Sequence, residues 1–117
     1  MFETGDIVIV DLLPVVGHEQ GSSDVRPCLV VTTSLDRCDD YYELLTIVPF
    51  TTTLTRGCGV LTPVVATPTL NDQYARSRAL LPQVRSIGPR RIMRKASPLS
   101  AEDLDAVKAA LKDYLKV

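Results

Sequence analysis

The chain has 117 residues, which is enough for one domain with a buried core and too few for two. Hydrophobic residues make up 45% and charged residues 23%. No apolar run reaches the roughly 18–20 residues that a membrane span needs. We therefore expect a single domain, residues 1–117, that does not enter a membrane. The N-terminal residues lack the basic and apolar segments of a secretion signal, so we also expect a cytoplasmic protein.

The net charge of −1 conceals an uneven distribution of charge along the chain. Residues 1–50 contain nine acids and two bases, whereas residues 73–101 contain seven bases and no acid. Clustered positive charge favours a phosphate-facing surface, and the alternative is a solvated face neutralised by the acidic half. The pI of about 5.7 argues against a protein that coats DNA. The bases of the second segment are Arg76, Arg78, Arg85, Arg90, Arg91, Arg94 and Lys95.

The three cysteines, Cys28, Cys38 and Cys58, have neither the C-x-x-C spacing of a zinc site nor the pattern of a disulfide framework. We expect all three to be reduced and Cys28 to pack as a small hydrophobic residue. No cluster of carboxylates and histidines has the spacing of metal ligands, so we expect neither a metal nor another cofactor.

The first half of the chain predicts three strands separated by polar loops. Residues 7–12 form a short β-branched run that is typical of a buried strand. A glycine-punctuated polar loop, residues 17–25, leads to Arg26, and a second strand begins at Pro27 and extends to about residue 33. Residues 34–40 are polar enough for a loop. Residues 43–50 predict a third strand that Pro49 ends.

The second half predicts shorter extended segments. A turn with two glycines at residues 55–59 precedes an expected strand at residues 60–66, and its internal Pro63 places that strand at a sheet edge. Residues 77–81 and 83–87 read as another extended segment that Pro82 interrupts.

The C-terminal residues change to a helical period. Ser100 is in position for an N-cap, with an acidic residue three positions later, and lysines gather toward the other end. Leu104, Val107, Leu111 and Leu115 recur at helical spacing, which predicts one amphipathic helix over about residues 101–116. Short strands followed by a terminal helix indicate a mainly β fold with α, a small barrel or strongly bent sheet with helical cover.

Four motifs in this order resemble the MazF/PemK-type toxins of bacterial toxin–antitoxin pairs. They are GDIVIVDL at residues 5–12 with Pro14, GHEQG at 17–21 followed by RPCLVV at 26–31, VPFT at 48–51, and QVRSI at 83–87 with RRI at 90–92. The resemblance covers nearly the whole chain. It implies an SH3-like, CcdB-like barrel that forms a homodimer. It also implies sequence-specific, metal-independent cleavage of single-stranded RNA, held in check by a cognate antitoxin protein.

The residues themselves fit such a reaction. RNA cleavage through its own 2′-hydroxyl needs a proton acceptor, a donor at the phosphoryl oxygens and a proton for the leaving 5′-oxygen. The guanidinium of Arg26 matches phosphate oxygens in pairs, and the hydroxyl of Thr51 can bond the same phosphate. The resemblance implies that these two residues are catalytic. The alternatives are a salt bridge of Arg26 to Asp24 or Glu19, and a turn hydroxyl at Thr51, with Thr52 a competing choice.

The remaining candidates are expected to contact substrate. Glu19 and Gln20 are suited to reading base edges, or to positioning Arg26 and supporting proton transfer, although Gln20, in a stretch between two glycines, also fits a turn-stabilising amide. His18, the single histidine, is expected to be a loop residue that contacts substrate. The alternative is a loop residue without a functional contact. Three further candidates come from the second half of the chain. Gln83 and Arg85 are expected at a groove wall or a dimer interface, and Arg90 is expected to hold a flanking phosphate.

Two departures from the family pattern concern the site. The loop from residue 21 to 26 is about two residues longer than the common form, which we expect to change the preferred RNA sequence. Pro82 replaces an acidic residue that often precedes the family's glutamine. The alternative function is a CcdB-like toxin that binds DNA gyrase without chemistry. An SH3-like adaptor is a third reading, and the six aromatic residues make it the least favoured.

Overall fold

The computed structural model describes residues 2–12, 25–36, 42–55, 59–71 and 73–117. The strands within these residues are β1 Ile7–Asp11, β2 Val25–Thr33, β3 Leu45–Thr51, β4 Val64–Pro68, β5 Tyr74–Ala79, β6 Arg85–Ile87 and β7 Ile92–Lys95. The single described α-helix is α1 Ala101–Leu115, and short 3₁₀ turns are η1 Ser34–Asp36, η2 Gly59–Leu61, η3 Leu81–Gln83 and η4 Pro89–Arg91.

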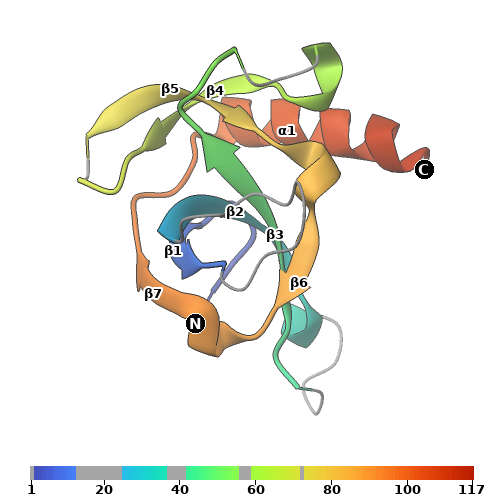
Figure 1. The fold of residues 1–117 in the computed structure, drawn as a ribbon. Helices are drawn as coiled ribbons and strands as arrows, with labels where there is room; N and C mark the ends of the chain where they lie inside the picture. The colour runs from blue at the N-terminus through green and yellow to red at the C-terminus, as the bar shows by residue number, and fades with distance from the viewer. Residues whose placement is uncertain (1, 13–24, 37–41, 56–58, 72) are drawn as a thin grey trace.

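The strands form one antiparallel sheet that bends into a ring. Its order is β4-β5-β3-β2-β1-β7, and β6 pairs with the first half of β3. Figure 1 shows β1, β2, β3, β6 and β7 around the ring, with α1 and the β4–β5 hairpin on its upper side. Among the described pairings none joins β6 to β7, so the ring is not closed by hydrogen bonds. The expected fold class, mainly β with one C-terminal helix, is confirmed.

Two apolar clusters hold the sheet together, one on each face. Along β1, Ile7 faces one cluster and Val8 and Val10 face the other, because neighbouring side chains of a strand point in opposite directions. The cluster that includes residues of α1 contains Ile7, Leu29, Val48, Phe50, Leu81, Val107 and Leu111. The cluster on the other face contains Val8, Val10, Leu12, Cys28, Val30, Leu45, Ile47 and Ile87. Burial on both faces explains the unbroken apolar run at residues 7–10.

The chain enters β1 through a tight turn at Gly5 and Asp6. Gly5 has φ of +96°, and an added Cβ would lie 3.0 Å from Leu104 Cδ2, so both the backbone and the available space favour glycine. Asp6 Oδ2 accepts the N–H of Glu3 at 2.9 Å and lies 3.3 Å from Lys95 Nζ. These two residues of the first motif therefore serve the fold.

Prolines account for two differences from the predicted strands. The strand expected at residues 60–66 is instead η2 followed by β4, since Pro63 stands before the strand and not inside it; β4 does lie at a sheet edge, as expected. Pro49 does not end β3 but lies within it, opposite Cys28. Its carbonyl accepts the N–H of Leu80 at 2.9 Å, so the residue still takes part in backbone pairing.

The segment around Pro82 follows the prediction, but strand β7 was not predicted. Pro82 lies in η3, between β5 and β6, so the predicted interruption is confirmed; β5 begins at Tyr74, earlier than expected. The run Ile92–Lys95 has too few apolar residues to predict a strand. It becomes β7 because it pairs with β1, with Val8 opposite Lys95, and this long-range partner is a tertiary effect.

Helix α1 agrees with the prediction except at its last turn. The hydroxyl of Ser100 accepts the N–H of Asp103 at 3.2 Å, as an N-cap does. Val107 and Leu111 are buried against the sheet. Leu115 is 50% exposed, so the predicted apolar stripe ends one turn early.

Candidate functional site

Arg26 lies in β2, at the end of the sheet where β1 finishes. It is opposite Val10 of β1. The β2–β3 ladder ends at Cys28 opposite Pro49, two residues after Arg26 on β2 and two residues before Thr51 on β3, and Thr51 itself pairs with Arg78 of β5. The strand ends therefore place the two residues that the sequence predicts as catalytic at one end of the same pair of strands.

Thr51 and Thr52 have different surroundings, although they are neighbours. Thr51 is 3% exposed, and its Oγ1 accepts the N–H of Thr53 at 3.2 Å. That bond uses the oxygen as an acceptor, and a hydroxyl also has one proton to donate. Thr52 is exposed and lines a groove together with Arg26, whereas Thr51 is not among the residues that line it.

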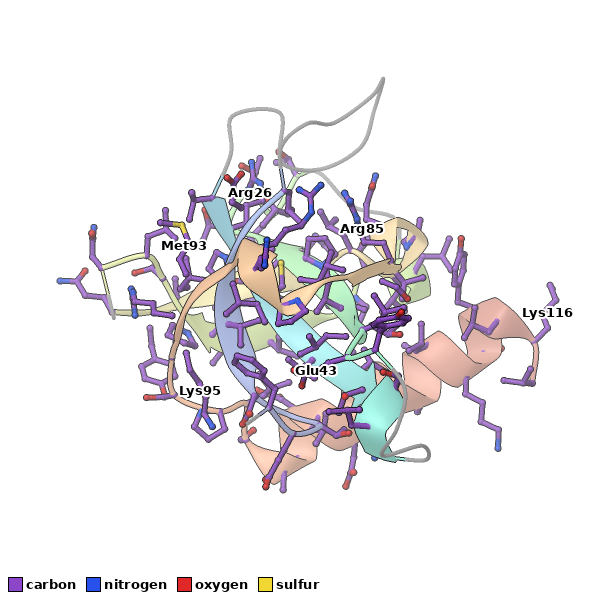
Figure 2. The ribbon with its side chains drawn as sticks, turned by 90° about the horizontal axis from the view of Figure 1, so that it is seen from below. Arg26, Glu43, Arg85, Met93, Lys95 and Lys116 are labelled. Atoms are coloured by element: carbon purple, nitrogen blue, oxygen red, sulfur yellow. The ribbon has the colours of Figure 1, made fainter. Side chains whose placement is uncertain are left out.

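Arg85 is at the same end of the molecule as Arg26. It is the first residue of β6 and is opposite Ile47 of β3. Figure 2 shows Arg26 and Arg85 in the upper part of the view and Lys95 in the lower part. Both guanidinium groups act electrostatically on the thiol of Cys28, which lies in the core below them. Two of the predicted site arginines are thus brought together from strands far apart in sequence.

Cys28 is fully buried, as the sequence predicts. Burial raises the pKa of its thiol well above the ordinary value of 9.0, and the positive charges of Arg26 and Arg85 oppose that rise without cancelling it. A thiol that keeps its proton is a poor nucleophile. Cys28 therefore contributes packing.

A groove of about 240 Å³ lies beside Arg26, between the start of β2, the end of β3 and the β4–β5 hairpin. Its apolar lining consists of Val25, Pro27, Phe50, Pro68 and Leu70. Its polar lining consists of Arg26, Thr52, Thr67, Thr69, Asn71 and Ser77. Only Arg26 and Thr52 were predicted as site residues.

The β4–β5 side of the groove was missed by sequence reasoning. Thr67 and Ser77 are each 1% exposed, and their hydroxyl oxygens lie 2.6 Å apart. We call these two residues the hydroxyl pair. Thr67 directly follows the strand expected at residues 60–66, and Ser77 begins the segment expected at residues 77–81; one hydroxyl at each place gives no signal of a site. Nothing in the sequence shows that both segments face Arg26.

Most of the predicted basic surface is used to hold the fold. Arg78 Nε donates to the carbonyl of Leu54 at 2.6 Å, and its Nη1 donates to the carbonyl of Thr62 at 2.8 Å. Arg94 Nη2 donates to the carbonyl of Leu70 at 2.7 Å. These arginines support the segments around the groove.

The other members of the basic stretch are distributed over several elements. Arg91 Nη1 donates to the carbonyl of Asp11 at 3.2 Å, and Lys95 pairs with Asp6. Arg76 on β5 and Arg90 on η4 are exposed. Gln83 is half-buried in η3, just before β6. The segment therefore supplies separate basic positions, and two of them, Arg85 and Arg91, lie at the end of the sheet where Arg26 is found.

Some of the sequence predictions lie outside the described residues. His18, Glu19 and Gln20 do so, as do Cys38 and Cys58. In the part of the chain that the structure describes, no three His, Cys, Asp or Glu side chains come together in a way that would hold a metal ion. No described helix is long and apolar enough to cross a membrane.

Solved structures with the same fold include several toxins. MazF (Form-I) from Deinococcus radiodurans has a TM-score of 0.73 and 23% identity, with 99% of this chain and 97% of that chain covered. The Mycobacterium tuberculosis toxin MazF-mt6 has a TM-score of 0.66 and 21% identity, with 96% and 97% covered. The MazE–MazF (Form-II) structure from Deinococcus radiodurans has a TM-score of 0.64 and 24% identity, with 99% and 96% covered.

At these identities the structural similarity establishes the fold, and the sequence comparison establishes the family. The search of curated proteins finds no match. The family model described as the PemK-like, MazF-like toxin of type II toxin–antitoxin systems matches residues 3–115. The chain therefore belongs to the PemK-like, MazF-like family of type II toxins.

Proposed function

We propose that this toxin is a metal-independent endoribonuclease that cleaves single-stranded RNA at specific sequences. The observation that supports the proposal most strongly is the position of Arg26. It lies at the end of the sheet where β1 finishes and lines the groove there. A guanidinium beside an open groove is suited to a phosphodiester, because its donors match phosphate oxygens in pairs.

In the proposed reaction the 2′-oxygen of one nucleotide attacks the adjacent phosphorus. The bond from phosphorus to the 5′-oxygen of the next nucleotide breaks, which leaves a 2′,3′-cyclic phosphate and a 5′-hydroxyl. The proton of the 2′-hydroxyl is removed and the leaving 5′-oxygen receives one. Arg26 donates to the phosphoryl oxygens as their negative charge increases, and the resemblance to the family assigns it proton transfer as well.

Thr51 is proposed to act on the same phosphate. Its oxygen already accepts a hydrogen bond from the backbone of residue 53, which fixes its orientation. Its own proton is then available for a phosphoryl oxygen. The residues proposed to contact the RNA on either side are His18, Glu19, Gln20, Thr52, Gln83, Arg85 and Arg90.

The proposed partners follow from the family. Type II toxins are paired with an antitoxin, and one solved structure of the same fold is a MazE–MazF complex. We propose that a cognate antitoxin protein binds this chain, and that the active form is a homodimer in the cytoplasm. The family match favours this function over the CcdB-like, gyrase-binding alternative.

The test uses purified protein, single-stranded RNA of varied sequence and excess EDTA. We expect fragments with cyclic phosphate and 5′-hydroxyl ends. A substrate with one 2′-deoxy nucleotide at the cut position should resist cleavage, because the nucleophile is then missing. The Arg26→Ala variant controls for contaminating ribonuclease. Intact RNA across all sequences, with gyrase inhibited instead, would contradict the proposal.

The roles of the two neighbouring threonines can be separated with matched substitutions. We expect Thr51→Val to slow cleavage roughly ten- to hundredfold, since a hydrogen bond to a charged group contributes about 1.5–3 kcal/mol. Thr51→Ser should restore most of the rate, because it keeps the hydroxyl. Thr52→Val serves as the neighbouring control and should have the smaller effect. The reverse order of effects would transfer the catalytic role to Thr52.

A further inference from the structure

We propose that Arg78 is a positioning residue for Thr51: its guanidinium fixes the turn that follows β3, and that turn orients the hydroxyl of Thr51. The inference rests on the proposed ribonuclease function, in which this hydroxyl donates to the phosphate. It gives a role in the reaction to an arginine that is not among the residues lining the groove.

Arg78 lies beside Thr51 in the sheet. Strand β5 is between β3 and β4, and Arg78 is opposite Thr51 on one side and opposite Val64 on the other. Directly opposed residues of antiparallel strands project from the same face of a sheet. The side chain of Arg78 therefore leaves the sheet on the same face as that of Thr51.

The chain beyond Thr51 returns to Arg78 at Leu54. Arg78 Nε donates to the carbonyl of Leu54 at 2.6 Å. Inside this turn the N–H of Thr53 donates to Thr51 Oγ1 at 3.2 Å. Since the sheet fixes Thr51 and the guanidinium fixes Leu54, the residue whose N–H orients the hydroxyl lies between two anchored positions.

Apolar packing gives this turn little support. Thr52, Thr53 and Thr55 are exposed, and Leu54 is only half-buried. Segments with few buried apolar contacts open readily. The hydrogen bond from Arg78 is charge-assisted, and such bonds are stronger than those between neutral groups. Arg78 therefore provides an attachment that the apolar core does not.

The guanidinium is itself held in place. Arg78 Nη1 donates to the carbonyl of Thr62 at 2.8 Å and lies 3.4 Å from Thr62 Oγ1. Thr62 is 4% exposed, and the carbonyl of the adjacent Pro63 accepts the N–H of Ala79 at 2.9 Å, which ties this stretch to β5. Because Nε and Nη1 both point to protein oxygens, the side chain bridges two segments of the chain instead of directing these nitrogens at a phosphate.

Arg76 provides the matched control. It is on the same strand, two residues before Arg78, and is opposite Ala66 of β4. Its side chain is exposed. Substitution of either arginine removes the same charge from the same strand. An effect of charge on RNA would therefore be shared by both variants, whereas a positioning effect on Thr51 would be found with Arg78 alone.

The first experiment measures cleavage of one defined RNA by Arg78→Met, Arg78→Lys and Arg76→Met, each alone and combined with Thr51→Val. We expect Arg78→Met to lower kcat about tenfold and to change KM by less than about twofold, because it misplaces a donor without removing a binding contact. In the Thr51→Val protein the same substitution should have almost no effect, since the hydroxyl it positions is already absent. Arg78→Lys should remain impaired, because one ammonium does not replace two donors in a fixed fork. Arg76→Met should have the same effect, if any, with and without Thr51.

Thermal unfolding identifies any variant that does not fold. If Arg78→Met fails to fold, Arg78→Lys carries the test, since it keeps the charge and the aliphatic stem. A general loss of structure would lower the rate by the same factor with and without the Thr51 hydroxyl. That result, or the wild-type kcat in a folded Arg78→Met or Arg78→Lys protein, would overturn the inference and leave the ribonuclease intact.

Amide hydrogen exchange tests the attachment without RNA. We expect the N–H of Thr53 to exchange about tenfold faster in Arg78→Met, as in a locally loosened segment, while the N–H of Val48 in the buried part of β3 keeps its wild-type rate. Arg76→Met should leave both rates unchanged. Faster exchange at Thr53 in a protein that cleaves no RNA would keep the attachment and reject the ribonuclease. Unchanged exchange at Thr53 would overturn the inference, even if RNA is cleaved.

Discussion

The two ends of the β1–β2 pair use their charged motif residues in opposite ways. At the end where β1 begins, Asp6 is 8% exposed, accepts the N–H of Glu3 and pairs with Lys95. At the other end Arg26 lines a groove of about 240 Å³. Both residues belong to motifs of the family. The difference shows that a charged motif residue becomes a candidate for chemistry when the fold sets it beside a space that a ligand can enter.

The largest expected effect is the loss of activity in Arg26→Ala. We expect RNA cleavage to fall by about 10²–10³-fold, or ~2.7–4 kcal/mol of transition-state stabilisation, as for other preorganised donors to a developing oxyanion. Arg26→Lys should recover little, because it keeps the charge without the paired donors. Initial rates on one defined RNA measure both. If Arg26→Ala cleaves at the wild-type rate, the end of the sheet where β1 finishes is not the catalytic end.

At the opposite end, Gly5→Ala should reduce stability and not chemistry. Alanine would be strained at φ of +96° and would press on Leu104 Cδ2, so we expect a loss of about 1–3 kcal/mol in the free energy of unfolding. Gly88→Ala is the control, because Gly88 has φ of −80° and no atom within 4 Å of an added Cβ. Urea unfolding of the two variants compares them directly. Equal losses would show that the turn at Gly5 is not strained by a side chain.

The burial of Cys28 predicts that the stability of the protein depends on pH in the alkaline range. Burial raises the pKa of its thiol, so above the ordinary value of 9.0 the unfolded chain loses this proton while the folded protein keeps it. The free energy of unfolding should therefore fall as pH rises above that value, by up to about 1.4 kcal/mol per pH unit from this group. Urea unfolding of wild type and Cys28→Ala across this range isolates the contribution as a difference in slope. Parallel curves would contradict it.

The smallest effect is expected from the ion pair at the end where β1 begins. Lys95 is 48% exposed in its side chain, so Lys95→Ala should change the free energy of unfolding by less than about 1 kcal/mol. Added salt should reduce the difference further. RNA cleavage should be unaffected. A large loss of cleavage would show that the two ends are not functionally separate.

The helix and the central strands could be predicted because their signals are local. Ser100 with its acidic first turn and the spacing of Val107 and Leu111 specify α1 without reference to the rest of the chain. The apolar run at residues 7–10 likewise specifies β1. By contrast β7 has a weak local pattern and forms by pairing with β1. Pro49 is tolerated inside β3, where it lies opposite Cys28 and its carbonyl accepts the N–H of Leu80.

The candidate site divides in the same manner. Arg26 and Thr51 could be proposed from the motifs around them, since each follows or precedes a clear strand. Thr67 and Ser77 could not, because threonine and serine are ordinary in strands. Only the hairpin that joins β4 to β5 and its placement against β2 give them a common groove.

By itself the sequence determined the family, the mainly β fold with its terminal helix, and the arginine and threonines on which the proposed chemistry depends. Those features lie in short ordered motifs and in periodic patterns, which can be recognised in the sequence without the tertiary structure. The tertiary structure decided how each polar residue is used. Asp6 forms an ion pair, and Arg78 and Arg94 donate hydrogen bonds to backbone carbonyls, and these interactions hold the fold. The tertiary structure also placed Arg26 beside the hydroxyl pair, because contacts between distant strands set which side chains share a space.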